Sequence, residues 1–163
     1  MLFRSYFLPT WRLRREIERV TSRGGRVRII LAGKTDVRLA QLASRRLYRR
    51  LLKHGVEIYE YQPQVLHAKL FLLDGAVYVG SSNLDLRSLR INYELMVRCT
   101  DSRMAEEARE IFRDIRRHCR AVRWEEWRAS RTLWTWLHER WAHFVLTRVD
   151  PYVARRQWRA LPD

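Results

Sequence analysis

The chain has 163 residues, of which 33 are Lys or Arg and 18 are Asp or Glu, so its formal net charge is +15. This length suffices for one domain with a substantial core and is too short for two ordinary domains. Such a positive field favours nucleic acid or an anionic membrane surface as partner, although a solvated basic surface without a dedicated partner has the same composition. Two cysteines exclude a disulfide framework, and no apolar run approaches the roughly 20 residues that span a bilayer.

Predicted strands and helices alternate along residues 1–122. Short runs that are aliphatic or that alternate polar and apolar residues predict strands, namely Leu2–Phe7, Arg26–Leu31, Val56–Tyr61, Leu70–Leu73, Ala76–Val79 and Asn92–Cys99. Apolar residues at helical spacing predict helices at Trp11–Arg23, from Asp36 to about His54, and from Asp101 or Ser102 to about Val122. Thr10, Asp36 and Asp101 are placed to cap these helices. This order predicts an α/β fold, with a mixed β-sheet flanked by helices.

Residues 123–163 differ in character from the predicted domain of residues 1–122. Most of the tryptophans lie here, and apolar side chains recur at three- and four-residue spacing in Leu133, Trp134, Leu137, Trp141, Phe144 and Val145, with arginines around them. We expect a helical C-terminal extension. A tryptophan-bearing stripe with basic flanks suits a membrane interface, but a helix that covers the sheet or a partner subunit has the same pattern.

The segment LHAKLFLLDGAVYVGSSNLD brings together residues that suit phosphodiester chemistry. We expect His67 and Lys69 to lie in a strand and, being two residues apart, to point to the same side of it. Asp74 and Gly75 form a dipeptide favoured in type I′ hairpin turns, so the chain folds back and brings Ser81 and Asn83 near His67. An imidazole can attack phosphorus while an ammonium and an amide hold the non-bridging oxygens.

This segment resembles the HKD motif of the phospholipase D superfamily, H-x-K-x4-D followed by G-S-x-N, with Glu94 at the position of a family acid. The flanks YEYQPQVLHAK and GSSNLDLRSLRINYE resemble the second half of bacterial cardiolipin synthases. The resemblance implies a phospholipase D-like half with a single HKD repeat. It implies a phosphohistidine intermediate, with a second histidine that protonates the leaving oxygen, and requires no metal or cofactor.

The resemblance also implies roles for the site residues. His67 is either the nucleophile or the general acid. Lys69, Ser81 and Asn83 bind the phosphoryl oxygens, and Glu94 accepts a hydrogen bond from a catalytic imidazole. Asp74 belongs to the motif, but its place in the hairpin indicates a mainly structural role, in the turn or in a salt bridge.

Three basic residues outside the motif are weaker candidates. Gly33-Lys34-Thr35 is not a P-loop, because Arg28 stands where that motif requires glycine. Similar turns border the site in the cardiolipin synthases it resembles, so Lys34 either contacts a lipid headgroup or is a plain loop lysine. Arg87 and Arg90 follow the G-S-x-N run and are placed to contact substrate phosphates.

A complete family site needs two HKD motifs, whereas this chain has one. The second comes from a homodimer or from a separate chain. We favour a detached or truncated second half of a cardiolipin synthase-type phosphatidyltransferase. It would act on an anionic phospholipid such as phosphatidylglycerol, as a peripheral protein at the cytoplasmic face of the bacterial membrane. The alternatives are a homodimeric nuclease acting on DNA or RNA, and an inactive fragment that binds membranes or a partner subunit.

Overall fold

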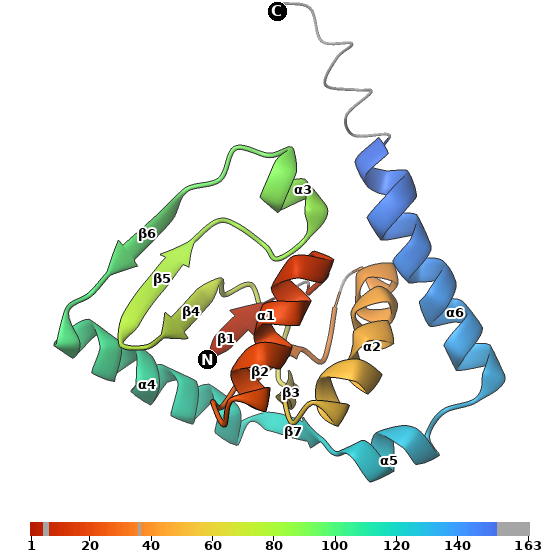
Figure 1. Cartoon of the computed structure of the whole chain (residues 1–163), viewed down its shortest axis with the longest axis horizontal. Helices are drawn as coiled ribbons and strands as arrows, with labels where there is room; N and C mark the ends of the chain where they lie inside the picture. The colour runs from red at the N-terminus through yellow and green to blue at the C-terminus, as the bar shows by residue number, and fades with distance from the viewer. Residues whose placement is uncertain (5–6, 36, 153–163) are drawn as a thin grey trace, which may run out of the picture.

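The computed structural model describes residues 1–4, 7–35 and 37–152 (Figure 1). Seven strands form one mixed sheet in the order β6-β5-β4-β1-β2-β3-β7. Their bounds are β1 Leu2–Arg4, β2 Arg28–Ala32, β3 Glu57–Tyr61, β4 Leu70–Leu73, β5 Ala76–Gly80, β6 Met96–Cys99 and β7 Cys119–Val122. The helices are α1 Trp11–Ser22, α2 Arg38–Lys53, α3 Leu86–Arg90, α4 Ser102–Arg117, α5 Trp124–Ala129 and α6 Leu133–Phe144, which continues as the π-helix η1 Val145–Val149. The predicted mixed α/β sheet flanked by helices is confirmed.

The direction of the strands determines where the site lies. Strands β1, β2 and β3 are parallel, and β4 runs antiparallel to β1 with Phe3 opposite Leu70. The carboxyl ends of β1–β3 and the start of β4 therefore lie at the same edge of the sheet. The carboxyl end of β5 and the start of β6 also lie there, because Leu70 pairs with Val79 and Gly80 with Met96. We call this the site edge.

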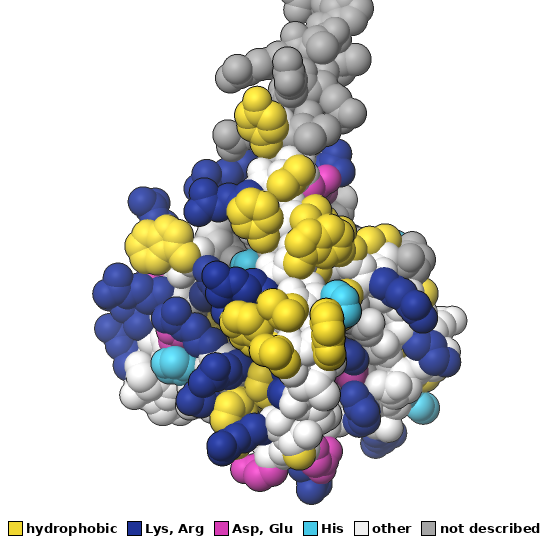
Figure 2. Space-filling view, turned by 90° about the vertical axis from the view of Figure 1, so that its right-hand side faces the viewer, with side chains coloured by type: hydrophobic (Ala, Val, Ile, Leu, Met, Phe, Trp, Pro, Cys, Tyr) yellow, Lys and Arg dark blue, Asp and Glu magenta, His cyan; other side chains and the backbone are white. Residues whose placement is uncertain are grey.

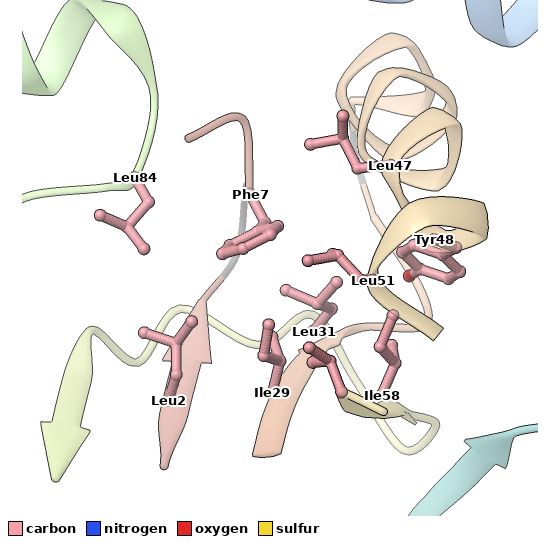
Figure 3. Close-up of a cluster of buried hydrophobic side chains, with 10 residues drawn as sticks. Leu2, Phe7, Ile29, Leu31, Leu47, Tyr48, Leu51, Ile58 and Leu84 are labelled. Atoms are coloured by element: carbon pink, nitrogen blue, oxygen red, sulfur yellow. The ribbon is translucent and has the colours of Figure 1, made fainter. Parts of the chain in front are cut away.

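Helices cover both faces of the sheet, as the alternation of side chains along each strand requires. On one face, residues of β1, β2 and β3 pack against α2 and α1, and Figure 3 shows Leu47, Tyr48 and Leu51 of α2 above Ile29 and Ile58. On the other face, Phe3 and Ile30 pack against Phe112 of α4, whose ring centroid lies 4.9 Å from that of Phe3. Helix α6 packs on the outer side of α2 through Ala142, Ala43 and Leu8.

A buried carboxylate joins α2, β3 and β7. Glu60 of β3 is 2% exposed, and its carboxylate accepts hydrogen bonds from Arg45 at 3.0 Å, from Arg120 at 2.8 Å and from the Tyr48 hydroxyl at 3.3 Å. Burial, followed by the nearby Glu60 charge, raises the pKa of Tyr48 well above its usual value. Tyr48 therefore remains a neutral donor to Glu60.

The local signals for the hairpin and for two caps are confirmed. Asp74 and Gly75 have φ angles of 47° and 86°, both positive as a type I′ turn requires, and Leu73 pairs with Ala76 across the turn. The Thr10 side chain accepts a hydrogen bond from the Leu13 amide, and Asp101 caps α4. Val37 occupies the N-cap position of α2, whereas Asp36, predicted as the cap, lies outside the described residues.

Three predicted elements are wrong in extent. The helix predicted to about Val122 ends at Arg117, and Cys119–Val122 forms β7, which pairs antiparallel with β3. The strand predicted at Asn92–Cys99 begins only at Met96, because α3 and a loop occupy the preceding segment. The first strand ends at Arg4, and Phe7 makes an isolated bridge with Leu84. Of the C-terminal extension, residues beyond 152 lie outside the described part.

Candidate active site

His67 and Lys69 lie in the loop that leads into β4, so their predicted placement within a strand is wrong. The strand begins at Leu70, which pairs with Phe3 of β1. The Lys69 carbonyl nevertheless accepts a hydrogen bond from the Gly80 amide at 3.3 Å. This bond fixes the loop beside the end of β5, at the site edge.

The His67 side chain is exposed to solvent, and the Lys69 side chain is partly exposed. The Lys69 ammonium donates to the His67 carbonyl at 3.0 Å, so the lysine folds back along its own loop. The exposed imidazole of His67 is accessible to a phosphate ester. A buried ring would have ruled out the role predicted for His67.

Gly80 allows β6 to approach the hairpin closely. A Cβ atom built on Gly80 would lie 2.0 Å from the Leu95 carbonyl oxygen, a distance that no side chain tolerates. The backbone of Ser81 then pairs with Leu95, since the Ser81 amide donates to the Leu95 carbonyl at 3.0 Å. Glycine is therefore required at this position of the G-S-x-N run to bring Glu94 beside Ser81.

Ser81 and Glu94 form the closest polar contact of the site. The Ser81 hydroxyl donates to Glu94 Oε2 at 2.5 Å and accepts from the Leu95 amide at 3.1 Å. The Ser81 hydrogen bond lowers the pKa of Glu94 below its usual value. Bonds from Ser88 and Asn92 and the positive charge of Lys69 act in the same direction, while partial desolvation opposes them. The carboxylate thus stays ionised near Lys69.

The loop that carries Asn83 is anchored to the segment after β1. The Leu8 amide donates to the Leu84 carbonyl at 2.7 Å, and both Leu8 and Leu84 are buried. Asn83 Oδ1 is itself buried and has no hydrogen-bond partner among the described residues. The topology therefore brings Asn83 to the same edge as His67 and Lys69.

Asp74 is not brought together with the other motif residues. It lies in the turn at the far end of the β4–β5 hairpin from Lys69, and its positive φ serves the reversal. Its position agrees with the structural role that the sequence indicated for it. The strand β4 separates its carboxylate from the site edge.

The weaker candidates lie near the site edge in different surroundings. Lys34 follows β2, is exposed, and donates to the Pro63 carbonyl at 3.4 Å, in the segment that leads towards His67. Arg87 lies on α3 and forms an ion pair of 3.5 Å with Asp150, just beyond η1. Arg90 ends the same helix and is exposed.

Sequence reasoning missed the short helix α3 and the residues it supplies. Ser88 of α3 and Asn92, in the loop after it, both hydrogen-bond Glu94. A signal was present, because Asp85 caps this helix by accepting a bond from the Ser88 amide at 2.8 Å. An aspartate three residues before a serine, followed by leucines and arginines, is typical of such a helical start.

Known proteins show strong similarity to this chain. It is 37% identical over 98 residues to the probable cardiolipin synthase YwiE of Bacillus subtilis, covering 60% of this chain and 20% of that protein. It is 36% identical over 107 residues to cardiolipin synthase B of Escherichia coli, covering 65% of this chain and 26% of that protein. It is 35% identical over 140 residues to cardiolipin synthase A of Klebsiella pneumoniae, covering 85% of this chain and 29% of that protein. The chain thus spans less than a third of these relatives.

Solved structures share the fold at low sequence identity. Nuc of Salmonella typhimurium, a phospholipase D family member, superposes with a TM-score of 0.64 at 19% identity, over 75% of this chain and 80% of Nuc. Phosphatidylserine synthase of Haemophilus influenzae gives 0.66 at 16% identity, over 94% of this chain and 40% of that one. Residues 1–116 match the family described as cardiolipin synthase, phospholipase D-like domain. The chain therefore belongs to this phospholipase D-like family, as its motif predicted.

Proposed function

We propose that the chain is the second half of a cardiolipin synthase-type phosphatidyltransferase, which cleaves and re-forms a phosphodiester through a phosphohistidine. The observation that carries the proposal is the arrangement at the site edge, where the segment of His67 and Lys69 is hydrogen-bonded to Gly80 and Ser81 holds Glu94. Family membership and relatives named as cardiolipin synthases support it.

The reaction proceeds in two displacements at phosphorus. One imidazole nitrogen forms a bond to phosphorus as the bond to the leaving alcohol breaks, and a second imidazole gives the leaving oxygen its proton. An acceptor alcohol then attacks the phosphohistidine, breaks the P–N bond and returns its proton to the second imidazole. His67 supplies one of these two imidazoles, while Lys69 and Asn83 hold the non-bridging oxygens and Glu94 orients an imidazole.

The second imidazole comes from a second HKD half, supplied by a homodimer or by another chain. In this proposal residues 1–122 are the catalytic half and residues 123–163 are a helical tail. The substrate is an anionic phospholipid such as phosphatidylglycerol, and the protein works as a peripheral protein at the cytoplasmic face of the membrane. Within the described residues, no helix is both long enough and apolar enough to cross a membrane.

A reconstitution experiment tests this proposal. The chain is incubated with phosphatidylglycerol vesicles, alone and together with the first-half domain of cardiolipin synthase B as a separate polypeptide, and cardiolipin is measured by mass spectrometry. We expect cardiolipin in at least one mixture and none with His67→Ala. Equal cardiolipin from the parent chain and from His67→Ala, or none from either, would overturn the proposal.

A homodimeric nuclease is the second candidate. It is favoured by the net charge of +15 and by the fold shared with Nuc, of which the match covers 80%. Cleavage of single-stranded DNA in the presence of EDTA, lost in His67→Ala, would support this function. Such cleavage without any cardiolipin formation would replace the first proposal.

A further inference from the structure

One side of α6 exposes a line of large apolar side chains. Trp134 is 72% exposed, Trp141 60% and Phe144 58%. Helical spacing places them on the same side of the helix as two leucines, and we call the set the outer stripe: Leu133, Trp134, Leu137, Trp141 and Phe144. Figure 2 shows hydrophobic side chains gathered along this helix, with Lys and Arg on both sides. Contiguous exposed apolar surface of this kind marks an interaction site.

The side of α6 away from the outer stripe carries its fully buried contact with the domain. There, Ala142 is fully buried against Ala43, and the ring of His143 lies 3.3 Å from the Ala43 carbonyl oxygen. Glu139, also on this side, is buried and forms a bidentate ion pair with Arg131. Whatever covers the stripe therefore lies outside the described residues.

A basic groove of about 310 Å³ borders the stripe. Its basic side chains come from α2 and from the α5–α6 region, and they are Arg46, Arg49, Lys53, Arg128 and Arg131. Trp136, three residues after Leu133, forms one wall of the groove and connects it to the stripe. The acid that lines the groove, Glu139, is already occupied by Arg131. None of the described acidic side chains forms an ion pair with Arg46, Arg49 or Arg128.

We propose that this face docks on an anionic membrane, with the outer stripe in the interface and the basic groove around a lipid phosphate. Tryptophan rings rest at the depth of the headgroups, and arginines beside them attract anionic lipid. The positive charge of the groove favours an anionic membrane over a second copy of the chain. A second copy of the chain would bring another strongly basic surface, whereas an anionic bilayer offers both phosphates and an apolar layer. The inference deepens the proposed function, on which it rests for the presence of a lipid substrate.

The docking face is connected to the site edge. Asp150, just beyond η1, pairs at 3.5 Å with Arg87 of α3, the helix that also supplies Ser88 to Glu94. Figure 1 shows α6 and η1 rising along α2 towards the side of the molecule where α3 lies. The end of this helix beyond the outer stripe therefore lies beside α3, whereas the basic groove lies towards the opposite edge of the sheet, where α5 follows β7.

Vesicle co-sedimentation of the whole chain tests the proposal. The parent is compared with a stripe variant, Trp134→Ser with Leu137→Ser and Trp141→Ser, and with a groove variant, Arg46→Gln with Arg49→Gln and Arg128→Gln. Vesicles contain phosphatidylglycerol mixed with phosphatidylcholine, or phosphatidylcholine alone. We expect the partition coefficient on the anionic vesicles to fall on the order of 100-fold in each variant.

Control variants lie on α4, which covers the other face of the sheet. Met104→Ser with Ile111→Ser removes exposed apolar side chains there, and a triple variant removes the same charge at Arg103, Arg109 and Arg117. Both controls are expected to bind like the parent, and thermal unfolding shows that all variants fold. Equal losses in the α4 controls, or unchanged binding of the stripe and groove variants, would overturn the proposal.

Failure of docking and failure of the proposed chemistry are separable. His67→Ala is expected to bind anionic vesicles as the parent does, because the docking face excludes the motif. Vesicle binding by a chain that forms no cardiolipin would support the docking proposal and contradict the transferase proposal. A stripe variant that forms cardiolipin and still binds vesicles as the parent does would contradict the docking proposal alone. The transferase proposal would then stand.

Discussion

The Ser81 hydroxyl donates a 2.5 Å hydrogen bond to the Glu94 carboxylate, which links the end of β5 to the residue that precedes β6 by two positions. The same hydroxyl accepts the Leu95 amide, so its proton is committed to Glu94. Ser81 therefore sets the charge and position of the family acid. A direct role of Ser81 at the phosphate would compete with this bond.

The Ser81–Glu94 bond predicts a shift in the titration of Glu94. Its depressed pKa means that the carboxylate stabilises the fold above the ordinary value of 4.5, and that this stability is lost as the pH falls through the lower, folded-state pKa. In Ser81→Ala the pKa of Glu94 should rise, so the loss should begin at a higher pH. Carbon-detected NMR titration measures this, with Ser130→Ala as control. An unchanged Glu94 titration would contradict the assignment.

Substitutions in the loop before β4 should remove activity without unfolding the chain. We expect Lys69→Ala to lower turnover by roughly 10²–10³-fold, because an ammonium that holds charge at phosphorus is worth about as much as an oxyanion donor. His67→Ala should lower it at least as much, and His118→Ala, on an exposed histidine at the end of α4, should leave it unchanged. Activity is measured as cardiolipin formed. Parental turnover in Lys69→Ala would contradict the proposed role.

The turn at the far end of the hairpin predicts a different outcome for Asp74. Asp74→Asn should retain both fold and activity, because asparagine also accepts a positive φ and the turn lies away from the site edge. Gly75→Ala should cost about 1 kcal/mol of unfolding free energy, since alanine is strained at a φ of 86°. Denaturant unfolding and the cardiolipin assay measure these. Loss of activity in a folded Asp74→Asn would give Asp74 a catalytic role.

The buried Glu60 carboxylate predicts a stability cycle. Arg45→Leu combined with Arg120→Leu should destabilise the fold by about 3–5 kcal/mol, because a carboxylate that is 3% exposed loses both its cations. Adding Glu60→Leu should recover much of that loss, since no buried charge then remains. Urea unfolding of the parent and of the two combined variants measures the cycle. If adding Glu60→Leu lowers the free energy of unfolding further, the buried charge is not the cause of the loss.

Cysteine reactivity gives a further check on the position of β7. Burial raises the pKa of Cys119 from 9.0 to about 11, and its thiol donates to the Ile115 carbonyl at 3.2 Å. Thiolate at neutral pH is therefore about 100-fold scarcer than for an ordinary cysteine. Mass spectrometry after iodoacetamide treatment should show alkylation of Cys119 slower by about this factor than that of a model thiol. Alkylation at the model rate would show that Cys119 is not packed as described.

Features that depend on a few neighbouring residues could be predicted from the sequence. The turn at Asp74-Gly75 requires two positive φ angles, and the Thr10 and Asp101 caps require one side chain each. Strand β7 could not be predicted in the same way. Cys119–Val122 is extended because the edge of β3 is available, which the local sequence does not encode.

The candidate site shows the same division. The motif predicted that His67, Lys69 and Ser81 would lie at one edge of the sheet, and the Gly80–Lys69 hydrogen bond places their segments side by side. The motif did not show that His67 and Lys69 lie before the strand, because the start of β4 depends on pairing with β1 and β5 in the folded sheet. The bonds of Ser88 and Asn92 to Glu94 also depend on tertiary structure, since α3 must first form.

A crystal structure of the chain with tungstate, a phosphate analogue, tests the convergence of the motif side chains most directly. We expect the anion at the site edge, with its oxygens about 3 Å from the side-chain nitrogens of His67, Lys69 and Asn83. His67→Ala with Lys69→Ala should leave this position empty under the same conditions. Tungstate bound elsewhere, or an Asn83 side chain out of reach of an anion held by His67 and Lys69, would contradict the proposed phosphodiester site.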